Sequence, residues 1–359
     1  MNAFYQSISG KRMQSIILKC KPGAQFHIGE GSLVDVSHII HSDTLFSAIA
    51  NIYEMVYKEG EEFVRLVDEN QITISSAFPL LENIKSGSFI YFLPKPKIYF
   101  EQSVVLGKKE KKIKFISLNA FNKISEGFDS TSLSSKFDLS ELHIFADEYA
   151  LLKDELQISK QIKSPFIKEQ IFPKTAVHKE NREDAFYFQT EIQLIPFYDE
   201  DSKICYKPHF YFLLNESLNE SEKKKFITCL RVLADEGIGG DRGSGKGFIE
   251  EVIIKEIEGI AGNQTNYSMI LSLANPSSQS EFDNIIQYDL IKRGGGSIGV
   301  EGQPESHRKQ VRMITEGSII NSNITGRVVD VSPSVNHYKH KVYRNGKAYL
   351  ISMGRKNEE

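Results

Sequence analysis

The chain has 359 residues, 40% of them hydrophobic and 25% charged, which is typical of a water-soluble protein with room for two ordinary domains. A net charge of −3 argues against a free-standing nucleic-acid binder with a broad basic face, so any such site is expected to be local or shared with a partner. The three cysteines are isolated, which argues against a zinc site and against disulfides. The N-terminus does not resemble a signal peptide and no apolar run is long enough to span a membrane, so we expect a cytoplasmic protein.

A strand and then a helix are predicted near the N-terminus. Apolar and polar residues alternate over 16–20, as in a strand, and apolar residues recur at helical spacing over 45–56. Ser42 or Asp43 can cap this helix. Because the first N–H groups of a helix are free and its dipole favours negative charge, His41 and Ser42 are candidate phosphate contacts; a plain helix cap is the alternative. No convincing set of three ligands accompanies the nearby histidines, so no metal is predicted.

A long insertion, roughly residues 60–184, is predicted between this helix and the next strand of the domain. Its segment 91–97 contains two prolines, which suit an edge strand or an extended segment. In that segment Lys95 and Lys97 lie among aromatic residues, a pattern that fits RNA contact and a plain edge strand equally well. The basic tract 108–114 has the composition of a solvated face.

Two strands and a second helix are predicted after the insertion. The segment 186–194 alternates, with its polar residues expected to face solvent, and is expected to pair with 210–214. A helix begins at Ser221, and Gly237 occupies the position where a glycine commonly ends a helix. With a strand over 248–254, the order becomes β–α–β–β–α–β, which is the ferredoxin-like order.

Residues 237–247 read GIGGDRGSGKG, with six glycines in eleven positions. Glycine allows positive φ and close approach of the backbone to a ligand, and successive exposed N–H groups form anion-binding concavities. We therefore infer a phosphate-bearing ligand, best fitted by a polynucleotide backbone, with a long flexible turn as the alternative. The candidate contacts in this loop are Gly239, Gly240, Arg242, Gly243, Ser244, Gly245 and Lys246.

Two nucleotide-binding patterns fit this loop poorly. Residues 240–246 match the first seven positions of a Walker A motif, but Gly247 replaces the Ser or Thr that binds Mg²⁺. The loop also lies between a helix and a strand, whereas a P-loop runs from strand to helix. Arg242 stands where the Rossmann pattern needs its third glycine. Nucleotide hydrolysis is therefore disfavoured.

The pattern of elements restarts after residue 258. We predict a first domain over 1–258 and a second, smaller ferredoxin-like domain over 259–359. In the second domain, the segment 292–297 places three glycines beside charged residues. Arg293 and Arg308 are candidates there for RNA contact or for docking of a partner protein, two alternatives that the sequence does not separate.

Three local signatures resemble the RAMP proteins of CRISPR–Cas systems, and among them the fourth Csm subunit of type III-A interference complexes, a relative of the Cas-five group. They are the runs IHSDTLFSA over 40–48 and LPKP over 93–96, followed by the glycine-rich loop. RAMP proteins in general share the loop, whereas the two other signatures point specifically to the fourth Csm subunit. The resemblance spans nearly the whole chain. The resemblance implies an α+β fold of two ferredoxin-like (RRM-like) domains, the first carrying an insertion with a hairpin called the thumb.

The resemblance also implies a non-catalytic role in antiviral defence. Such subunits grip the repeat-derived 5′ handle of the CRISPR RNA (crRNA), anchor the large polymerase-like subunit and adjoin a RAMP backbone subunit; no cofactor, metal or membrane is implied. It further implies RNA-facing basic residues ahead of the strand at 186, namely Lys174, His178 and Arg182. In the layout of this family the basic tract 108–114 would lie on the insertion, where contact with guide or target RNA is the alternative to a solvated face. The alternative is a metal-independent endoribonuclease that processes CRISPR precursor RNA, for which His41 is the candidate general base.

Overall fold

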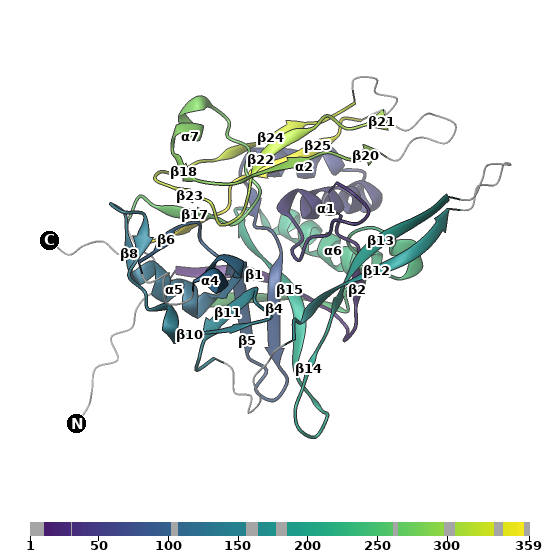
Figure 1. Ribbon diagram of the computed structural model, residues 1–359. Helices are drawn as coiled ribbons and strands as arrows, with labels where there is room; N and C mark the ends of the chain where they lie inside the picture. The colour runs from purple at the N-terminus through teal and green to yellow at the C-terminus, as the bar shows by residue number, and fades with distance from the viewer. Residues whose placement is uncertain are drawn as a thin grey trace.

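A ten-stranded sheet lies at the centre of the molecule (Figure 1). The structure is a computed structural model that describes residues 11–29, 31–101, 107–155, 164–176, 185–260, 265–297, 306–333 and 340–354. The main path of the sheet runs in the order β10 (Leu142–Phe145), β11 (Tyr149–Leu152), β7 (Phe115–Ser117), β5 (Phe89–Pro94), β4 (Phe78–Asn83), β15 (Ile204–Glu216), β1 (Lys11–Lys19) and β16 (Glu251–Ile260). Off this path, β3 (Ile72–Ile74) and β14 (Phe197–Tyr198) pair with β15.

Two long helices accompany the four strands β4, β15, β1 and β16. Helix α1 (Ser42–Tyr57) follows β1 in the chain, α6 (Glu220–Glu236) follows β15, and the two helices contact each other. Helix α6 starts at a capping box made by Asn219 and Glu222 and ends at Gly237, as the sequence predicted for its end. Shorter helices are α2 (Gly60–Asp68), α4 (Lys108–Lys112) and α5 (Leu118–Glu126), of which α5 contacts β5, β7 and β11. The predicted α+β class is confirmed.

The strand predicted over 186–194 exists, but its predicted pairing with 210–214 is wrong. This strand, β13 (Ala185–Leu194), pairs with β12 (Ile167–Ala176) and β2 (Gln25–Phe26) in a separate three-stranded sheet. The place beside β15 belongs to β4. Residues 208–214 of β15 are buried on both faces, so their neighbour must also be apolar on both faces. Four consecutive buried residues at the start of β4 meet that need, whereas the alternating polar residues of β13 do not.

The segment 91–97 is not an edge strand, which was one of the two alternatives predicted for it. Strand β5 lies inside the sheet, paired with β4 on one side and β7 on the other. Both prolines are tolerated because Pro94 closes the strand and Pro96 lies beyond it, so neither removes a hydrogen bond from the middle of the ladder.

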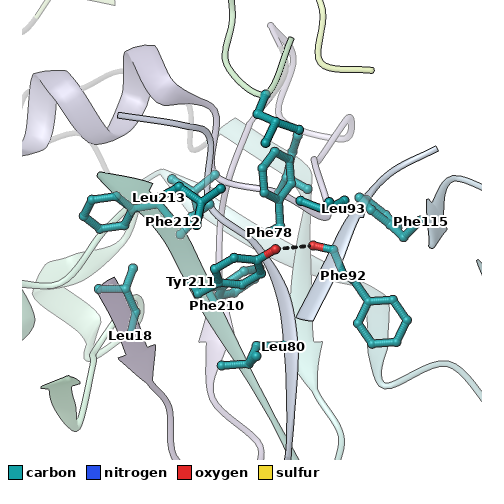
Figure 2. Packing of buried hydrophobic residues seen from close by; sticks show 14 of the residues in the cluster. Leu18, Phe78, Leu80, Phe92, Leu93, Phe115, Phe210, Tyr211, Phe212 and Leu213 are labelled. Atoms are coloured by element: carbon teal, nitrogen blue, oxygen red, sulfur yellow. Dashed lines mark hydrogen bonds between the residues drawn. The ribbon is translucent and has the colours of Figure 1, made fainter. Parts of the chain in front are cut away.

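One large hydrophobic core joins the central sheet to the C-terminal region. Aromatic residues of β5 and β15 meet inside it, and the hydroxyl of Tyr211 donates a hydrogen bond of 2.8 Å to the carbonyl of Phe92 (Figure 2). Met269, Leu271 and Tyr349 from the C-terminal region belong to the same core. A second, smaller core contains Ile270, Ala274, Ile285, Ile314, Ile320 and Ile324. The C-terminal region is therefore packed into the rest of the chain.

The C-terminal region consists mainly of short antiparallel strands. One sheet has the order β18 (Ile285–Gln287), β23 (Ile319–Ile320), β17 (Ser268–Ile270) and β26 (Leu350–Ser352). The two-stranded pairs are β19 (Leu290–Arg293) with β22 (Val311–Ile314), β20 (Gly296–Ser297) with β21 (Ser306–His307), and β24 (Gly326–Asp330) with β25 (Tyr343–Lys347). The described part of this region has one helix, α7 (Gln279–Asp283), so the two helices of a second ferredoxin-like unit are not seen there. None of the described helices has the length and apolar character needed to cross a membrane.

Candidate nucleic-acid interface

The glycine-rich loop has a base that is clamped to strand β2 and the residue after it. The N–H of Gly240 donates to the carbonyl of His27 at 2.9 Å, and the N–H of Gly247 donates to the carbonyl of Gln25 at 2.8 Å. A Cβ added to Gly239 would lie 2.6 Å from the carbonyl oxygen of His27, which is too close for any other residue. The predicted contacts Gly239 and Gly240 therefore have a structural role, because they allow two backbones to approach each other.

The tip of the loop, Arg242–Gly245, projects into solvent. It forms a single 3-10 turn that is entered through Asp241 at φ 58° and left through Gly245 at φ 81°. All four tip residues are exposed, and a Cβ added to Gly243 or Gly245 would meet nothing within 4 Å. The hydroxyl of Ser244 donates to the carbonyl of Asp241 at 2.8 Å, while no hydrogen bond or ion pair joins the guanidinium of Arg242 to the described residues.

Beneath the tip lies a neutral cluster of two lysines and two acids. Lys246 contacts the carboxylate of Glu191 and lies 3.7 Å from Asp241, and Lys174 contacts Asp241 and lies 3.4 Å from Glu191. Glu191 is only 1% exposed. Burial opposes ionisation of Asp241, but hydrogen bonds from Lys174 and Gln189 outweigh it and lower the pKa of this carboxyl group. The structure thus brings the predicted contacts Lys174 and Lys246 together, but each is neutralised within the chain.

The start of helix α1 is buried. His41 is 4% exposed, and its Nδ1 lies 2.8 Å from the carboxylate of Glu316. The N–H of Ser42 donates to the hydroxyl of Ser76 at 2.9 Å, and the hydroxyl of Ser42 accepts the N–H of Leu273 at 3.0 Å. The predicted helix cap by Ser42 or Asp43 is wrong, because His41 holds the N-cap position and no side chain caps the helix. His41 and Ser42 therefore have almost no exposed surface for a phosphate and instead join α1 to the C-terminal region.

Asp43, next along α1, is fully buried between two arginines. Arg293 donates to its two carboxylate oxygens at 2.9 and 3.0 Å, and Arg344 contacts it as well. Burial opposes ionisation, but the charges of Arg293 and Arg344 outweigh it and hold the pKa of Asp43 at about 2. Arg293, a predicted RNA or partner contact, is therefore an internal ion-pair partner of α1.

This ion pair predicts a loss of stability in acid. The pKa of Asp43 is about 2 in the folded chain and near 3.8 in the unfolded chain, so its stabilisation is complete above pH ~4 and is lost as the pH falls toward 2. The expected contribution is about 2 kcal/mol. Urea unfolding of the unmodified chain and of Asp43→Asn checks this: the difference between their unfolding free energies should shrink between pH 5 and pH 2. A difference that stays constant over this range would contradict the assignment.

Lys95 and Lys97 are also held inside the chain. The ammonium of Lys95 donates to the carbonyl of Glu110 at 2.9 Å and contacts its carboxylate. The ammonium of Lys97 donates to the hydroxyl of Thr315 at 2.6 Å and lies 3.3 Å from Asp289. Burial lowers the pKa of Lys97. Lys95 and Lys97 therefore bind groups of the chain itself, and Lys97 contacts the turn at Thr315 in the C-terminal region.

Arg308 lies near Arg344, whose pKa its charge helps to lower after the larger effect of burial. Arg308 is half-buried near the β20–β21 pair, and its N–H donates to the carbonyl of Gly295 at 3.1 Å. His178 and Arg182 lie outside the described residues. In the basic tract, Lys112 and Lys114 pair with acids of the turn before β11. Within the described part of the chain, no group of three or more His, Cys, Asp or Glu residues could hold a metal ion.

The β12–β13 hairpin carries an exposed apolar face that the sequence did not predict. Ile171 and Phe186 are each 65% exposed and Phe188 is 51% exposed, and the two phenylalanine rings meet edge-on with centroids 5.2 Å apart. The expected orientation of this strand is reversed over 186–191, because Gln189 and Glu191 face the glycine-rich loop and are buried. The alternation of the strand was visible in the sequence, but alternation does not say which face is covered. Strands β12 and β13 extend outward on the right of Figure 1.

Comparison with protein-family models gives two matches that follow each other along the chain. Residues 24–250, more than half of the chain, match the RAMP superfamily. Residues 263–353 match the CRISPR Csm4 C-terminal domain. A curated relative from Methanocaldococcus jannaschii, the CRISPR system Cms protein Csm4, is 29% identical over 384 residues, which cover 96% of this chain and 99% of the relative.

Solved structures show the same fold. A chain in the crystal structure of a Csm3–Csm4 subcomplex of the type III-A CRISPR–Cas interference complex matches with a TM-score of 0.65 and 24% identity, covering 94% of this chain and 99% of that one. A chain of a Csm1–Csm4 cassette in complex with pppApA matches with a TM-score of 0.54 and 20% identity, covering 97% and 100%. At these identities the likeness is one of fold.

Proposed function

Since this chain belongs to the RAMP superfamily, we propose that it acts in the cytoplasm as a non-catalytic RNA-binding and scaffolding subunit of a type III-A CRISPR effector complex. The proposed ligand is the repeat-derived 5′ handle of the crRNA. The proposed protein partners are the large polymerase-like subunit and an adjoining RAMP backbone subunit. The similar solved structures, which are Csm1–Csm4 and Csm3–Csm4 assemblies, support this choice of partners.

The exposed tip of the glycine-rich loop is the observation that carries the RNA-binding part of the proposal. Arg242 has no acidic partner among the described residues, so its charge remains available for a phosphate. Gly243 and Gly245 leave open space on which a sugar–phosphate backbone can lie close to the chain. The clamped base and the lysine cluster beneath it fix the tip in place, which reduces the entropy lost on binding. Lys174 and Lys246 act in this proposal as supports of the tip.

We infer that the β12–β13 hairpin is the thumb of this subunit. Its exposed face carries Phe186 and Phe188, and aromatic side chains offer stacking surfaces to unpaired bases. Hydrogen bonds from Lys174 and Gln189 to Asp241 join the hairpin to the glycine-rich loop. His178 and Arg182 lie between the two strands in sequence, and their RNA contact stays a prediction.

We also propose a division into two units, 1–258 and 259–359. The strand order β16–β1–β15–β4, with α1 and α6 in the connections, supports a ferredoxin-like first unit. The two family matches, over 24–250 and 263–353, fall on either side of the proposed boundary. A ferredoxin-like order in the second unit stays a prediction.

The burial of His41 supports a non-catalytic role over the ribonuclease alternative. A general base must come within hydrogen-bond reach of the 2′-hydroxyl that it deprotonates, about 2.6–3.2 Å. His41 is held against Glu316 beneath the C-terminal region and has almost no exposed surface. Cleavage of RNA by this residue would therefore require the C-terminal region to move away from α1.

The loop proposal is tested by Arg242→Ala. Loss of one phosphate contact should weaken binding of the 5′ handle about tenfold and lower the slope of log affinity against log salt by about 0.7. Fluorescence anisotropy with a labelled handle RNA measures both quantities. The matched control is Arg231→Ala, which removes an exposed arginine from α6. If both variants keep the affinity and slope of the unmodified chain, the loop tip does not bind RNA. Lys246 is a poor target because its removal would leave the buried Glu191 less well paired.

A further inference from the structure

The hairpin formed by β19 and β22 presents two cations that pair with no acid among the described residues. Lys292 lies directly opposite Arg312 in the register, and both side chains are exposed. Neither forms an ion pair with the described residues. Like charges directly opposite each other destabilise a pair of strands, so this arrangement has no structural benefit. The described segments 290–297 and 306–314 together contain five Lys or Arg residues and no Asp or Glu.

Lys292 and Arg312 differ from most of the predicted RNA-binding lysines in having no acidic partner among the described residues. Lys95, Lys97, Lys174 and Lys246 each have an acidic partner inside the chain. In a protein with a net charge of −3, exposed cations without such partners are the ones that a polyanion can neutralise.

The end of the same hairpin that continues into β20 and β21 carries a further excess of positive charge. Arg293 and Arg344 share the single carboxylate of Asp43. The nearby charge of Arg308 helps to lower the pKa of Arg344, after the larger effect of burial. The Nε of Arg308 is buried without a hydrogen-bond partner, and its guanidinium forms no ion pair with the described residues. Three guanidinium groups with one carboxylate give this end of the hairpin a positive potential that attracts anions, although Arg293 and Arg344 are themselves buried.

Exposed aromatic and apolar side chains lie next to the cations. Leu290, two positions before Lys292 on β19, shares its face of the strand and is 50% exposed. Tyr288, two positions earlier again, is 39% exposed and meets the ring of Phe282 edge-on, with centroids 5.8 Å apart. A stacking surface beside a row of cations is the combination that single-stranded nucleic acid recognises.

We propose that this face of the β19–β22 hairpin is a second binding surface for single-stranded RNA, separate in sequence from the glycine-rich loop. Lys292 and Arg312 bind phosphates, Arg308 adds to the attraction, and Tyr288 stacks on a base. This inference rests on the proposed function only in taking RNA as the ligand. The exposed aromatic ring favours RNA over an acidic protein surface. The outer end of this region, the β20–β21 pair, extends toward the same side of the molecule as the β12–β13 hairpin (Figure 1).

The test uses the full chain and two RNAs: a labelled oligouridylate of about 20 nucleotides and the labelled 5′ handle. Fluorescence anisotropy is measured over a series of KCl concentrations. Loss of two phosphate contacts in Lys292→Gln/Arg312→Gln should lower the slope of log affinity against log salt by about 1.4. The control Lys224→Gln/Arg231→Gln, with the same charge change on the exposed face of α6, should leave the slope unchanged. Tyr288→Ala should weaken binding at least about fivefold at an unchanged slope.

The outcomes separate this inference from the proposed function. Wild-type affinity and slope in Lys292→Gln/Arg312→Gln, together with a weakened Arg242→Ala, would overturn the inference and leave the glycine loop in place. A weakened Lys292→Gln/Arg312→Gln together with wild-type affinity and slope in Arg242→Ala would support RNA binding by the β19–β22 hairpin and contradict RNA binding by the glycine-rich loop. If the double variant binds RNA normally but no longer co-purifies with the partner subunits, the face docks protein and the inference is wrong. If the unmodified chain binds neither RNA, both proposals fall.

Discussion

Asp43→Asn is expected to lower the free energy of unfolding by about 3–5 kcal/mol, which corresponds to a fall in melting temperature on the order of 5–10 °C. Asparagine has nearly the same shape as aspartate but carries no charge. The guanidinium groups of Arg293 and Arg344 would then remain buried without a counter-charge. Because these arginines come from the C-terminal region, the substitution should loosen the contact between that region and α1. Thermal and urea unfolding measure the effect.

Asp201→Asn provides the matched control for this substitution. Asp201 lies in an exposed turn, 3.8 Å from an exposed lysine, and such pairs contribute little to stability. Its melting temperature should stay within about 1 °C of the unmodified chain, since surface substitutions of this kind change stability by at most about 0.5 kcal/mol. If Asp43→Asn behaves like Asp201→Asn, the buried ion pair does not hold the two regions together.

Gly247→Ala is expected to destabilise the chain by at least about 2 kcal/mol and to detach the tip of the glycine-rich loop. Gly247 has φ +74°, and a Cβ there would lie 2.1 Å from the carbonyl oxygen of Ile238. An alanine can be accommodated only if the base of the loop opens, which breaks the hydrogen bond from the Ile238 N–H to the Gly247 carbonyl. Thermal unfolding and handle RNA binding should therefore both weaken.

Gly243→Ala is the control, because Gly243 lies at the open tip of the loop whereas Gly247 lies at its crowded base. An added Cβ at Gly243 meets nothing within 4 Å, and its φ lies outside the positive range. Its stability should therefore match that of the unmodified chain, within about 0.5 kcal/mol. Equal melting temperatures for Gly247→Ala and Gly243→Ala would show that the base of the loop is not rigid.

The sequence was most informative where a signal is local. Alternating residues and helical spacing identified β1, α1 and α6, and Gly237 ends α6 as a helix-terminating glycine should. The three signatures also identified the family correctly, because each is a short run of residues. In each of these cases the deciding interactions lie within a few residues of one another.

Contacts between residues far apart in the sequence determine which of the predicted contact residues are exposed, and the sequence does not reveal these contacts. The free N–H groups at the start of α1 favoured an anion, yet Glu316, 275 residues away, binds His41 and closes this end of the helix. Similarly, the acids that neutralise Lys174 and Lys246 come from the loop and from β13, which no spacing rule connects. A sequence does not show which acid a lysine pairs with, so paired and unpaired cations could be distinguished only in the folded chain.

Site-directed crosslinking tests the central claim most directly. A thiol introduced by Ser244→Cys at the exposed loop tip, and one introduced by Ser86→Cys in the exposed turn between β4 and β5, would carry a photoactivated crosslinker in the assembled complex with its guide RNA. We expect Ser244→Cys to crosslink to the 5′ handle and Ser86→Cys to give only background. A yield of RNA crosslinks from Ser244→Cys no higher than that from Ser86→Cys would contradict the assignment of the loop to the RNA backbone.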